Sequence, residues 1–218
     1  VCDNHIPISR GLGSSAAAIV SGLLIGNELS ENHLSTKDLF ALGSEIEGHS
    51  DNIAATLFGG CQIVVQDKKI NSNVLIPKNL NVVLYIPKEH ISTDQARSVL
   101  PSSIAYSDVT HNLGRIALLI NSLNTGNLDD LKIATEDKLH QPYRQSILPF
   151  IRVIFNAAIN AGAHGAFLSG SGSTILALSS GKEMTIAYEM MDAASKAGIK
   201  GDTLITKPSF NGAKIDIL

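Results

Sequence analysis

The chain has 218 residues, of which 44% are hydrophobic, so it can bury the core of one large domain or of two smaller ones. Its net charge of −3 excludes a general attraction to nucleic acid or to an anionic membrane. The two cysteines form no metal-ligand spacing and no disulfide framework, and the longest apolar stretch is shorter than the roughly 20 residues of a membrane span, so we expect a cytoplasmic protein.

Residues 7–18 carry the most informative motif. Gly11 and Gly13 let the backbone turn tightly and approach a ligand, and the small residues that follow predict a helix over 14–29. Free N–H groups at the positive end of a helix favour phosphate. The residues expected at this site are Pro7, Ser9, Arg10, Gly11, Leu12, Gly13, Ser14, Ser15, Ala16 and Ala17. The Ser14 and Ser15 hydroxyls are candidate ligands for phosphate or its magnesium ion.

Three other interpretations of this motif are weaker. No lysine follows the glycines, so the P-loop pattern is absent. The residues also fit the loose dinucleotide-binding fingerprint, but Pro7 stands where that motif needs a buried strand. A simple helix-capping turn does not require two glycines, two serines and an alanine run in succession.

A second helix is predicted over 36–47, because Ser35 is a good N-cap and Asp38 follows three residues later. Glu45 and Glu47 lie near its end, where the helix dipole disfavours carboxylates, so a nearby cation would stabilise them. Two solvated surface glutamates are the alternative. Beside a phosphate loop, we favour a magnesium role for one of them.

His49, Asp51 and Asn52 form a polar cluster before a helical or turn segment at 53–58. A carboxylate can meet an ammonium group and an amide can orient a hydroxyl, so the cluster suits an amino alcohol. The alternative is that Asp51 or Asn52 only caps a helix.

The chain then continues with a strand over 61–65, a polar turn over 67–73 and a domain boundary near 78–79. A buried strand over 82–86 leads to a polar loop at 92–97 that contains Arg97. Arginine suits carboxylates, although a surface role fits the composition equally well.

Helical spacing predicts helices in the rest of the chain, and a glycine-rich loop interrupts them. The expected helices cover about 109–125, 128–139, 149–162 and 182–197, and strands are expected up to 178, over 202–206 and over Ala213 to Ile217. Residues 165–173 concentrate glycine and serine beyond the needs of a hairpin turn, which suits a backbone that passes close to a ligand.

The motifs together resemble one family. The pattern P-x-x-x-G-L-G-S-S-A-A is similar to the nucleotide-binding motif of the GHMP kinases, which include galactokinase, homoserine kinase and mevalonate kinase. The run E-I-E-G-H-S-D-N, followed by Gly59-Gly60, resembles the homoserine kinase subgroup, and residues 165–173 resemble the third family motif. Ser50 and Ser173 depart from the pattern, since proline is common at both positions.

The resemblance implies an α+β fold of two domains. Residues 1–78 would form the nucleotide-binding domain, similar to ribosomal protein S5 domain 2, and residues 79–218 a ferredoxin-like C-terminal domain. In the resembled family a strand-rich segment comes first, so we expect that an N-terminal piece of the domain is missing from this chain.

The implied activity is ATP-dependent phosphorylation of the L-homoserine hydroxyl to O-phospho-L-homoserine, in threonine biosynthesis, with Mg²⁺. Ser15 and Glu45, with Glu47 as the next candidate, would hold magnesium, while Asn52, Asp51 and His49 lie at the acceptor. Asn52 would orient the hydroxyl, and Asp51 is the carboxylate that could serve as a base. Arg97 and Arg144 would grip the carboxylate, and the glycine-rich loop would contribute Gly170, Ser171 and Gly172.

Alternatives remain open at this point. A GHMP kinase of mevalonate type gives no reason for two carboxylate-directed arginines, and a noncatalytic ATP-binding relative would bind nucleotide without turnover. A purely structural domain leaves the glycine loops without a purpose. No macromolecular partner is implied, and the resemblance leaves a homodimer open.

Overall fold

The computed structural model describes residues 1–31 and 33–216, and the chain divides into two compact units. Unit 1 comprises Val1–Ile8, Gly13–Ile76 and Pro208–Leu218, and unit 2 comprises Ser9–Leu12 and Pro77–Lys207. The chain passes from unit 1 to unit 2 between residues 76 and 77, whereas the sequence places a boundary near 78. The division also assigns part of the first glycine motif to unit 2, which no local pattern indicates.

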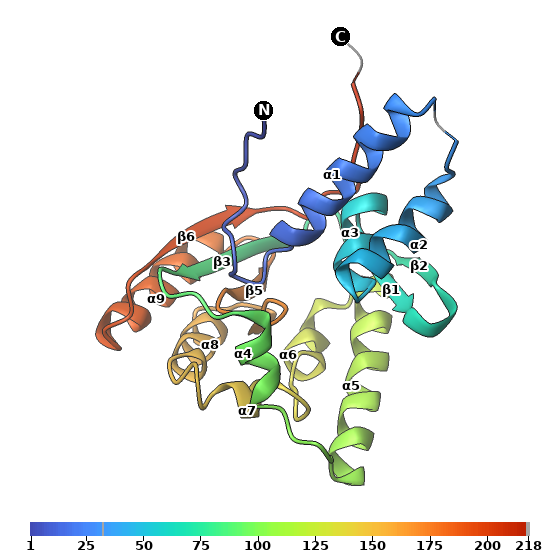
Figure 1. The fold of residues 1–218 in the computed structure, drawn as a ribbon. Helices are drawn as coiled ribbons and strands as arrows, with labels where there is room; N and C mark the ends of the chain where they lie inside the picture. Colours follow the sequence, from blue (N-terminus) through green and yellow to red (C-terminus); the bar gives the residue numbers. More distant parts are fainter. Residues whose placement is uncertain (32, 217–218) are drawn as a thin grey trace. The chain divides into compact units, whose positions relative to one another are not determined.

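Unit 1 contains three helices and a β-hairpin among its described residues: α1 Ser14–Leu29, α2 Thr36–Glu47, α3 Asp51–Phe58, β1 Cys61–Val65 and β2 Ile70–Val74 (Figure 1). The predicted bounds of α1 and α2 are confirmed. Their apolar faces pack with α3 into a core of Ala16, Val20, Leu39, Phe40, Ile53, Ala54 and Leu57. The predicted Ser35–Asp38 capping box is also confirmed.

The polar turn predicted over 67–73 is wrong in its second half. The chain reverses in a 3₁₀ turn over Gln66–Lys68, helped by a left-handed conformation at Lys69 (φ 50°). Residues from Ile70 onward then pair antiparallel with β1, from Val65↔Ile70 to Cys61↔Val74. Polar side chains are tolerated there because much of this hairpin is exposed.

Unit 2 is built on a four-stranded sheet with the order β4-β5-β3-β6, in which all neighbours are antiparallel. The strands are β3 Asn81–Pro87, β4 Gly165–Leu168, β5 Ile175–Ser179 and β6 Gly201–Thr206. With the helices α8 Ile151–Asn160 before β4 and α9 Glu183–Lys196 between β5 and β6, this is the predicted ferredoxin-like arrangement.

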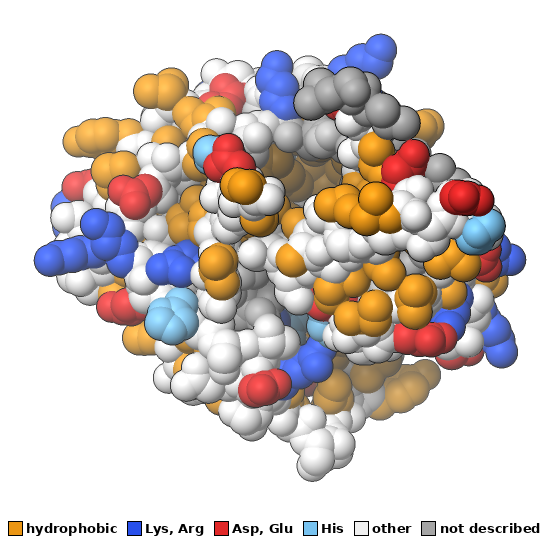
Figure 2. All heavy atoms as spheres, turned by 45° about the horizontal axis from the view of Figure 1, so that its top comes forward, with side chains coloured by type: hydrophobic (Ala, Val, Ile, Leu, Met, Phe, Trp, Pro, Cys, Tyr) orange, Lys and Arg blue, Asp and Glu red, His pale blue; other side chains and the backbone are white. Residues whose placement is uncertain are grey.

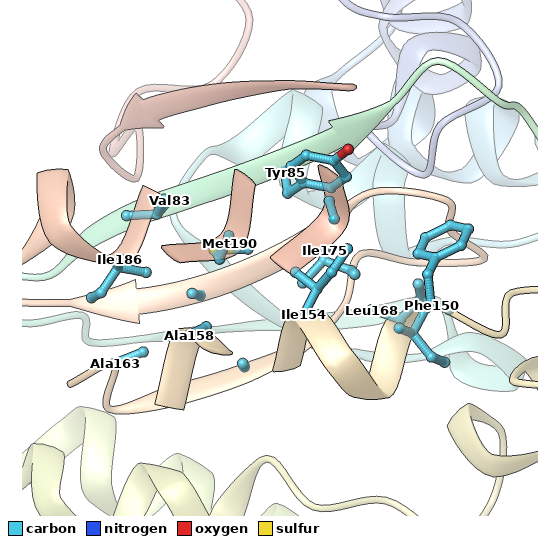
Figure 3. Packing of buried hydrophobic residues seen from close by; sticks show 14 of the residues in the cluster. Val83, Tyr85, Phe150, Ile154, Ala158, Ala163, Leu168, Ile175, Ile186 and Met190 are labelled. Atoms are coloured by element: carbon cyan, nitrogen blue, oxygen red, sulfur yellow. The ribbon is translucent and has the colours of Figure 1, made fainter. Parts of the chain in front are cut away.

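The core of unit 2 lies between this sheet and the two helices (Figure 3). The sheet contributes Val83, Tyr85 and Ile175, and their partners on α8 and α9 include Ile154 and Met190. Aliphatic side chains dominate, as expected for a chain without tryptophan. This packed layer is the rigid support for the loops that leave the sheet.

The remaining helices of unit 2 are α4 Thr93–Ser98, α5 Tyr106–Thr125, α6 Leu131–Ala134 and α7 Gln141–Arg144, with a 3₁₀ turn at Leu128–Asp130 (Figure 1). The loop predicted over 92–97 is wrong, because Ser92 and Gln95 form a capping box that starts α4.

The charged helix predicted over 128–139 is also wrong, because it stops at Ala134. The Asp137 carboxylate accepts hydrogen bonds from the N–H groups of Leu139, His140 and Gln141, and these bonds compete with a continuing helix.

The strand predicted over Ala213 to Ile217 is absent from the described residues 213–216, where the Ala213 N–H donates to the Thr56 carbonyl. Ile217 lies outside the described residues. No helix in the described part of the chain is long and apolar enough to cross a membrane. Figure 2 shows acidic and basic side chains dispersed over the face drawn, without a large field of one sign.

Candidate active site

The Ser9–Leu12 part of the first glycine motif belongs to unit 2, where it contacts the third glycine motif at residues 165–173. Gly11 has φ 72°, and a Cβ there would lie 2.0 Å from the Ser169 carbonyl oxygen. The Ser169 hydroxyl donates to the Gly11 carbonyl (2.7 Å), and the Thr174 N–H donates to the Arg10 carbonyl (3.2 Å). Two motifs about 160 residues apart in sequence are therefore in contact. Their spacing in sequence gives no signal of this.

Arg10 anchors the same segment through its side chain. Its guanidinium donates from Nε to the Pro87 carbonyl (2.7 Å) and from Nη2 to the Lys88 carbonyl, at the end of β3. Arg10 therefore fixes the path of the loop, whose own N–H groups stay the candidate phosphate ligands.

In unit 1 the motif continues into the N-terminus of α1. Gly13 is the N-cap, with φ 74°, and no side chain caps the helix. No acidic side chain lies in the first turn, and only the Asn52 Oδ1 atom (3.9 Å) would contact a Cβ on Gly13. The first N–H groups of this 16-residue helix thus have no capping side chain, and no acidic residue of the first turn competes for them. This arrangement fits a bound phosphate.

The two glutamates at the end of α2 have different partners. The Ser15 hydroxyl donates to Glu47 Oε2 (2.7 Å), whereas Glu45 forms an ion pair with Lys69. The cation expected at this helix end is therefore a lysine from the β1–β2 turn, and it contacts Glu45. The assignment of Glu45 to magnesium stays a prediction, but the geometry favours Glu47.

The oxygen atoms of Ser15 and Glu47 are hard ligands, and Mg²⁺ is usually held by one or two carboxylates together with substrate phosphates. The described residues contain no group of three or more His, Cys, Asp or Glu side chains that could hold a metal by itself. The Ser15–Glu47 pair therefore fits a magnesium ion that also binds phosphate, and does not fit a permanent metal centre.

The predicted acceptor cluster lies at the start of α3. His49 Nδ1 lies 3.3 Å from Asp51 Oδ1, and the same oxygen accepts from the Asn52 N–H (2.8 Å). Asp51 and Asn52 are both exposed, and Ser50 occupies the N-cap position without a side-chain bond. The Asn52 amide has no partner among the described residues. The structure thus brings Asn52 beside Gly13 in unit 1.

In unit 2 the two predicted arginines lie near each other but differ in their contacts. Arg144 is buried, 8% exposed; its Nε donates to the Ala96 carbonyl (3.1 Å) and its Nη1 to the Gly170 carbonyl (3.0 Å). Burial lowers the pKa of Arg144, and the charge of Arg97 acts in the same direction. Arg97 itself is exposed, and its guanidinium makes no hydrogen bond or ion pair within the described part of the chain.

Arg144 therefore holds the parts of this region in place. It joins the residue before Arg97 to the third glycine motif, in which Gly170 and Gly172 adopt positive φ angles of 55° and 90°. His140 lies 3.0 Å from Arg144 Nη1, and burial lowers its pKa, which favours the neutral ring at pH 7. Ser171 is half-buried beside these glycines. Arg97 is left as an exposed cation without a partner among the described residues.

Comparison with known families and proteins agrees with this geometry. Residues 1–60 match the GHMP kinases N terminal domain, and residues 112–198 match the GHMP kinases C terminal domain. The homoserine kinase of Caldanaerobacter subterraneus is 39% identical over 215 residues, which cover 97% of this chain and 69% of the relative. That of Caldicellulosiruptor bescii is 42% identical over 177 residues, covering 80% of this chain and 58% of the relative.

Solved structures give the same result. The homoserine kinase of Cytophaga hutchinsonii superposes with a TM-score of 0.89 at 30% identity, covering 96% of this chain and 69% of that protein. A mevalonate kinase of L. major, at 17% identity and a TM-score of 0.63, shares the fold. The chain thus spans between 58% and 69% of the length of the three homoserine kinases compared. It belongs to the GHMP kinase family, on the branch of the homoserine kinases.

Proposed function

We propose that this chain carries out the homoserine kinase reaction, in which the γ-phosphoryl group of ATP is transferred to the hydroxyl of L-homoserine to give O-phospho-L-homoserine. The observation that carries the proposal is the open N-terminus of α1, with the Ser15–Glu47 pair beside it. The homoserine kinase relatives supply the substrate. The proposal places the reaction in threonine biosynthesis in the cytoplasm, which the free cysteines Cys2 and Cys61 support.

Phosphate binding rests on backbone groups. The N–H groups that follow Gly13 donate to the ATP phosphates, and no acidic residue of this turn competes for them. Ser15 and Glu47 are proposed to hold Mg²⁺, which neutralises phosphate charge when bound. Catalysis by these residues is mainly positioning and charge stabilisation.

The acceptor residues of unit 1 are proposed to act on the amino alcohol. The unpartnered Asn52 amide accepts the hydroxyl hydrogen bond and orients its oxygen, while the exposed Asp51 carboxylate meets the ammonium group. His49 lies against Asp51 and fixes its position. The hydroxyl proton leaves to phosphate or to water, since the Asp51 carboxylate is assigned to the ammonium group.

The carboxylate of homoserine is assigned to Arg97. A guanidinium without a protein partner can form a bidentate pair with a carboxylate. Arg144 is proposed as a positioning residue, because its two backbone contacts hold the Ala96 and Gly170 carbonyls. This division of roles replaces the expectation that both arginines bind the substrate equally.

A coupled ADP-release assay of the full-length protein tests the proposal, with L-homoserine, mevalonate and galactose as parallel acceptors. We expect magnesium-dependent turnover with L-homoserine far above the other two. Preference for mevalonate would indicate another GHMP kinase. ATP binding without turnover of any acceptor would indicate a noncatalytic relative, and either result rejects the proposal.

A further inference from the structure

Unit 2 contains a cavity that the proposed kinase reaction does not use. It measures about 540 Å³ and is lined by α6, α7, α8, β4, one residue of α5 and the segment after α6. This volume is within the range of small-molecule sites, roughly 300–1,000 Å³. Its lining contains neither Arg97 nor any residue of the glycine motif at 7–18.

The charged side chains around the cavity leave two cations without partners. The acidic lining residues Glu136 and Asp137 are already satisfied. Glu136 accepts from Arg115 Nη2 (2.6 Å) and Nε (3.0 Å), and Asp137 accepts from three backbone N–H groups and from Asn112 Nδ2 (2.7 Å). By contrast, Lys132 and Arg152 make no ion pair or hydrogen bond within the described ranges 1–31 and 33–216.

A buried amide adds a neutral donor. Gln141 is 8% exposed, and its Oε1 accepts from the Leu168 N–H (2.8 Å), which fixes the amide against β4. Its Nε2 has no acceptor among the described residues, although Gln141 lines the cavity. Nε2 is not one of the fully enclosed polar atoms that lack a partner, so it is accessible and can donate to a ligand acceptor in the cavity.

The other part of the lining is apolar. Phe155 and Ile159 lie one turn apart on α8, and Ile151 and Ala166 complete the hydrocarbon surface. The cavity therefore combines cationic and amide donors with a surface suited to a short carbon chain.

We propose that this cavity binds a small monocarboxylate with a hydrocarbon chain. Among the charges of the lining, Lys138 is paired with Asp108 and Glu136 with Arg115, which leaves Lys132 and Arg152 against Asp137. The resulting net charge of +1 is matched by a single negative charge rather than by a dianion. Arg152, Lys132 and the Gln141 amide bind the carboxylate, and Phe155 and its apolar neighbours bind the chain. This site is independent of the proposed kinase function.

Hexanoate is the probe for this site, titrated into full-length protein labelled on its isoleucine methyl groups. We expect saturable NMR shifts for Ile151 and Ile159, with no change for Ile205 on β6 outside the cavity. Hexylammonium has the same chain with the opposite charge, and acetate lacks the chain. Both should bind at least tenfold more weakly than hexanoate. Unsaturable shifts, or equal binding of hexylammonium, overturn the proposal.

Arg152→Gln should weaken hexanoate binding by about tenfold to a hundredfold, since hydrogen bonds to charged groups are of that strength. Lys207→Gln removes an exposed cation outside the cavity and is the matched control, with unchanged binding. Arg152→Glu should reverse the preference toward hexylammonium. Arg152 is exposed, so its variants should keep the wild-type methyl spectrum without ligand. Unchanged hexanoate affinity in Arg152→Gln contradicts the assignment.

Discussion

The end of α2 in unit 1 and the α4–α7 segment of unit 2 each contain two side chains of like charge that differ in their contacts with the rest of the protein. Within the described part of the chain, Glu45 is paired with Lys69 while Glu47 has only a hydroxyl partner, and Arg144 is bound to backbone carbonyls while Arg97 has no partner. The two charges that have protein partners, Glu45 and Arg144, also differ from each other in burial. The Glu45 side chain is 64% exposed, where an ion pair contributes about 0–1 kcal/mol. Arg144 is buried, and its loss would leave the buried Ala96 carbonyl and the Gly170 carbonyl without their donor.

This comparison separates two kinds of observable. A charge whose partners belong to the protein should influence the free energy of unfolding, in proportion to its burial. A charge without a protein counterion should influence ligand binding and turnover, with little effect on stability. The two glycines of the first motif can be divided in the same way. Gly13 borders open space and should influence ligand binding, whereas Gly11 is packed against Ser169 and should influence stability.

The largest effect is expected at these glycines. Gly13→Val should abolish ATP binding, at least a hundredfold loss by calorimetry, because a branched side chain would stand in the phosphate site. The fold should largely survive, since the left-handed backbone conformation itself costs about 1–2 kcal/mol. Gly11→Ala should instead lower the melting temperature, because its Cβ would meet the Ser169 carbonyl. Unchanged ATP affinity in Gly13→Val would remove the phosphate assignment.

The next effect distinguishes the two glutamates. Glu47→Gln should raise the magnesium concentration needed for half-maximal turnover by about tenfold to a hundredfold, as for the loss of one charged ligand. Glu45→Gln, the matched control two residues earlier on the same helix, should change it by less than about threefold, since it loses only an exposed ion pair. A magnesium titration that shows the reverse order would return the assignment to Glu45.

Local sequence signals predicted the elements that local physics determines. The bounds of α1 and α2 follow from apolar spacing and from the Ser35 cap, and the ferredoxin-like order follows from the succession of elements. The partners of the site residues could not be predicted in this way. Lys69 at Glu45, Ser169 at Gly11 and Ala96 at Arg144 come from distant positions, and only the tertiary fold brings them together. The error at 128–139 has a local cause instead, because the Asp137 side chain accepts from backbone N–H groups two to four residues later in place of a continuing helix.

Arg97 provides a test of the open cation in unit 2. Arg97→Ala should raise the KM for L-homoserine by about tenfold to a hundredfold, because a charge-assisted pair contributes about 1.5–3 kcal/mol. Arg97→Lys should recover only part of the lost affinity, because an ammonium keeps the positive charge but lacks the planar guanidinium group that pairs with both carboxylate oxygens. ATP affinity and the melting temperature should stay at wild-type values. Wild-type homoserine kinetics in Arg97→Ala would reject the substrate contact while leaving the kinase assignment intact.

Arg144 provides the corresponding test of a cation whose partners belong to the protein. Arg144→Ala should lower the free energy of unfolding by about 2–4 kcal/mol in urea titrations, because the Ala96 and Gly170 carbonyls lose their donor. Turnover should fall as a secondary effect of displaced loops. A variant with full stability and a selective homoserine defect would show that Arg144 binds the substrate directly.

The smallest effect is expected at Asp137. Like Arg144, it is a charged side chain whose hydrogen bonds are made mainly with backbone groups. Burial alone would raise the pKa of Asp137, but hydrogen bonds from Gln141, His140, Asn112 and Leu139 outweigh it and hold that pKa below the ordinary value. The folded state therefore binds a proton less readily than the unfolded state. The stabilisation from Asp137 is complete above the unfolded pKa, about 3.9, and is lost as the pH falls through the lower folded pKa.

Asp137→Asn should thus reduce the free energy of unfolding by about 1–3 kcal/mol at pH 7, and the difference from wild type should shrink below about pH 4. Urea unfolding at pH 7, 5, 4 and 3 measures this dependence. Asp129→Asn is the matched control, because Asp129 is exposed and no hydrogen bond or ion pair engages its carboxylate in the described part of the chain. It should differ little from wild type across this range. If the loss of unfolding free energy in Asp137→Asn stays the same at pH 3, the amide disrupts the geometry of these hydrogen bonds and the negative charge of Asp137 does not contribute to stability.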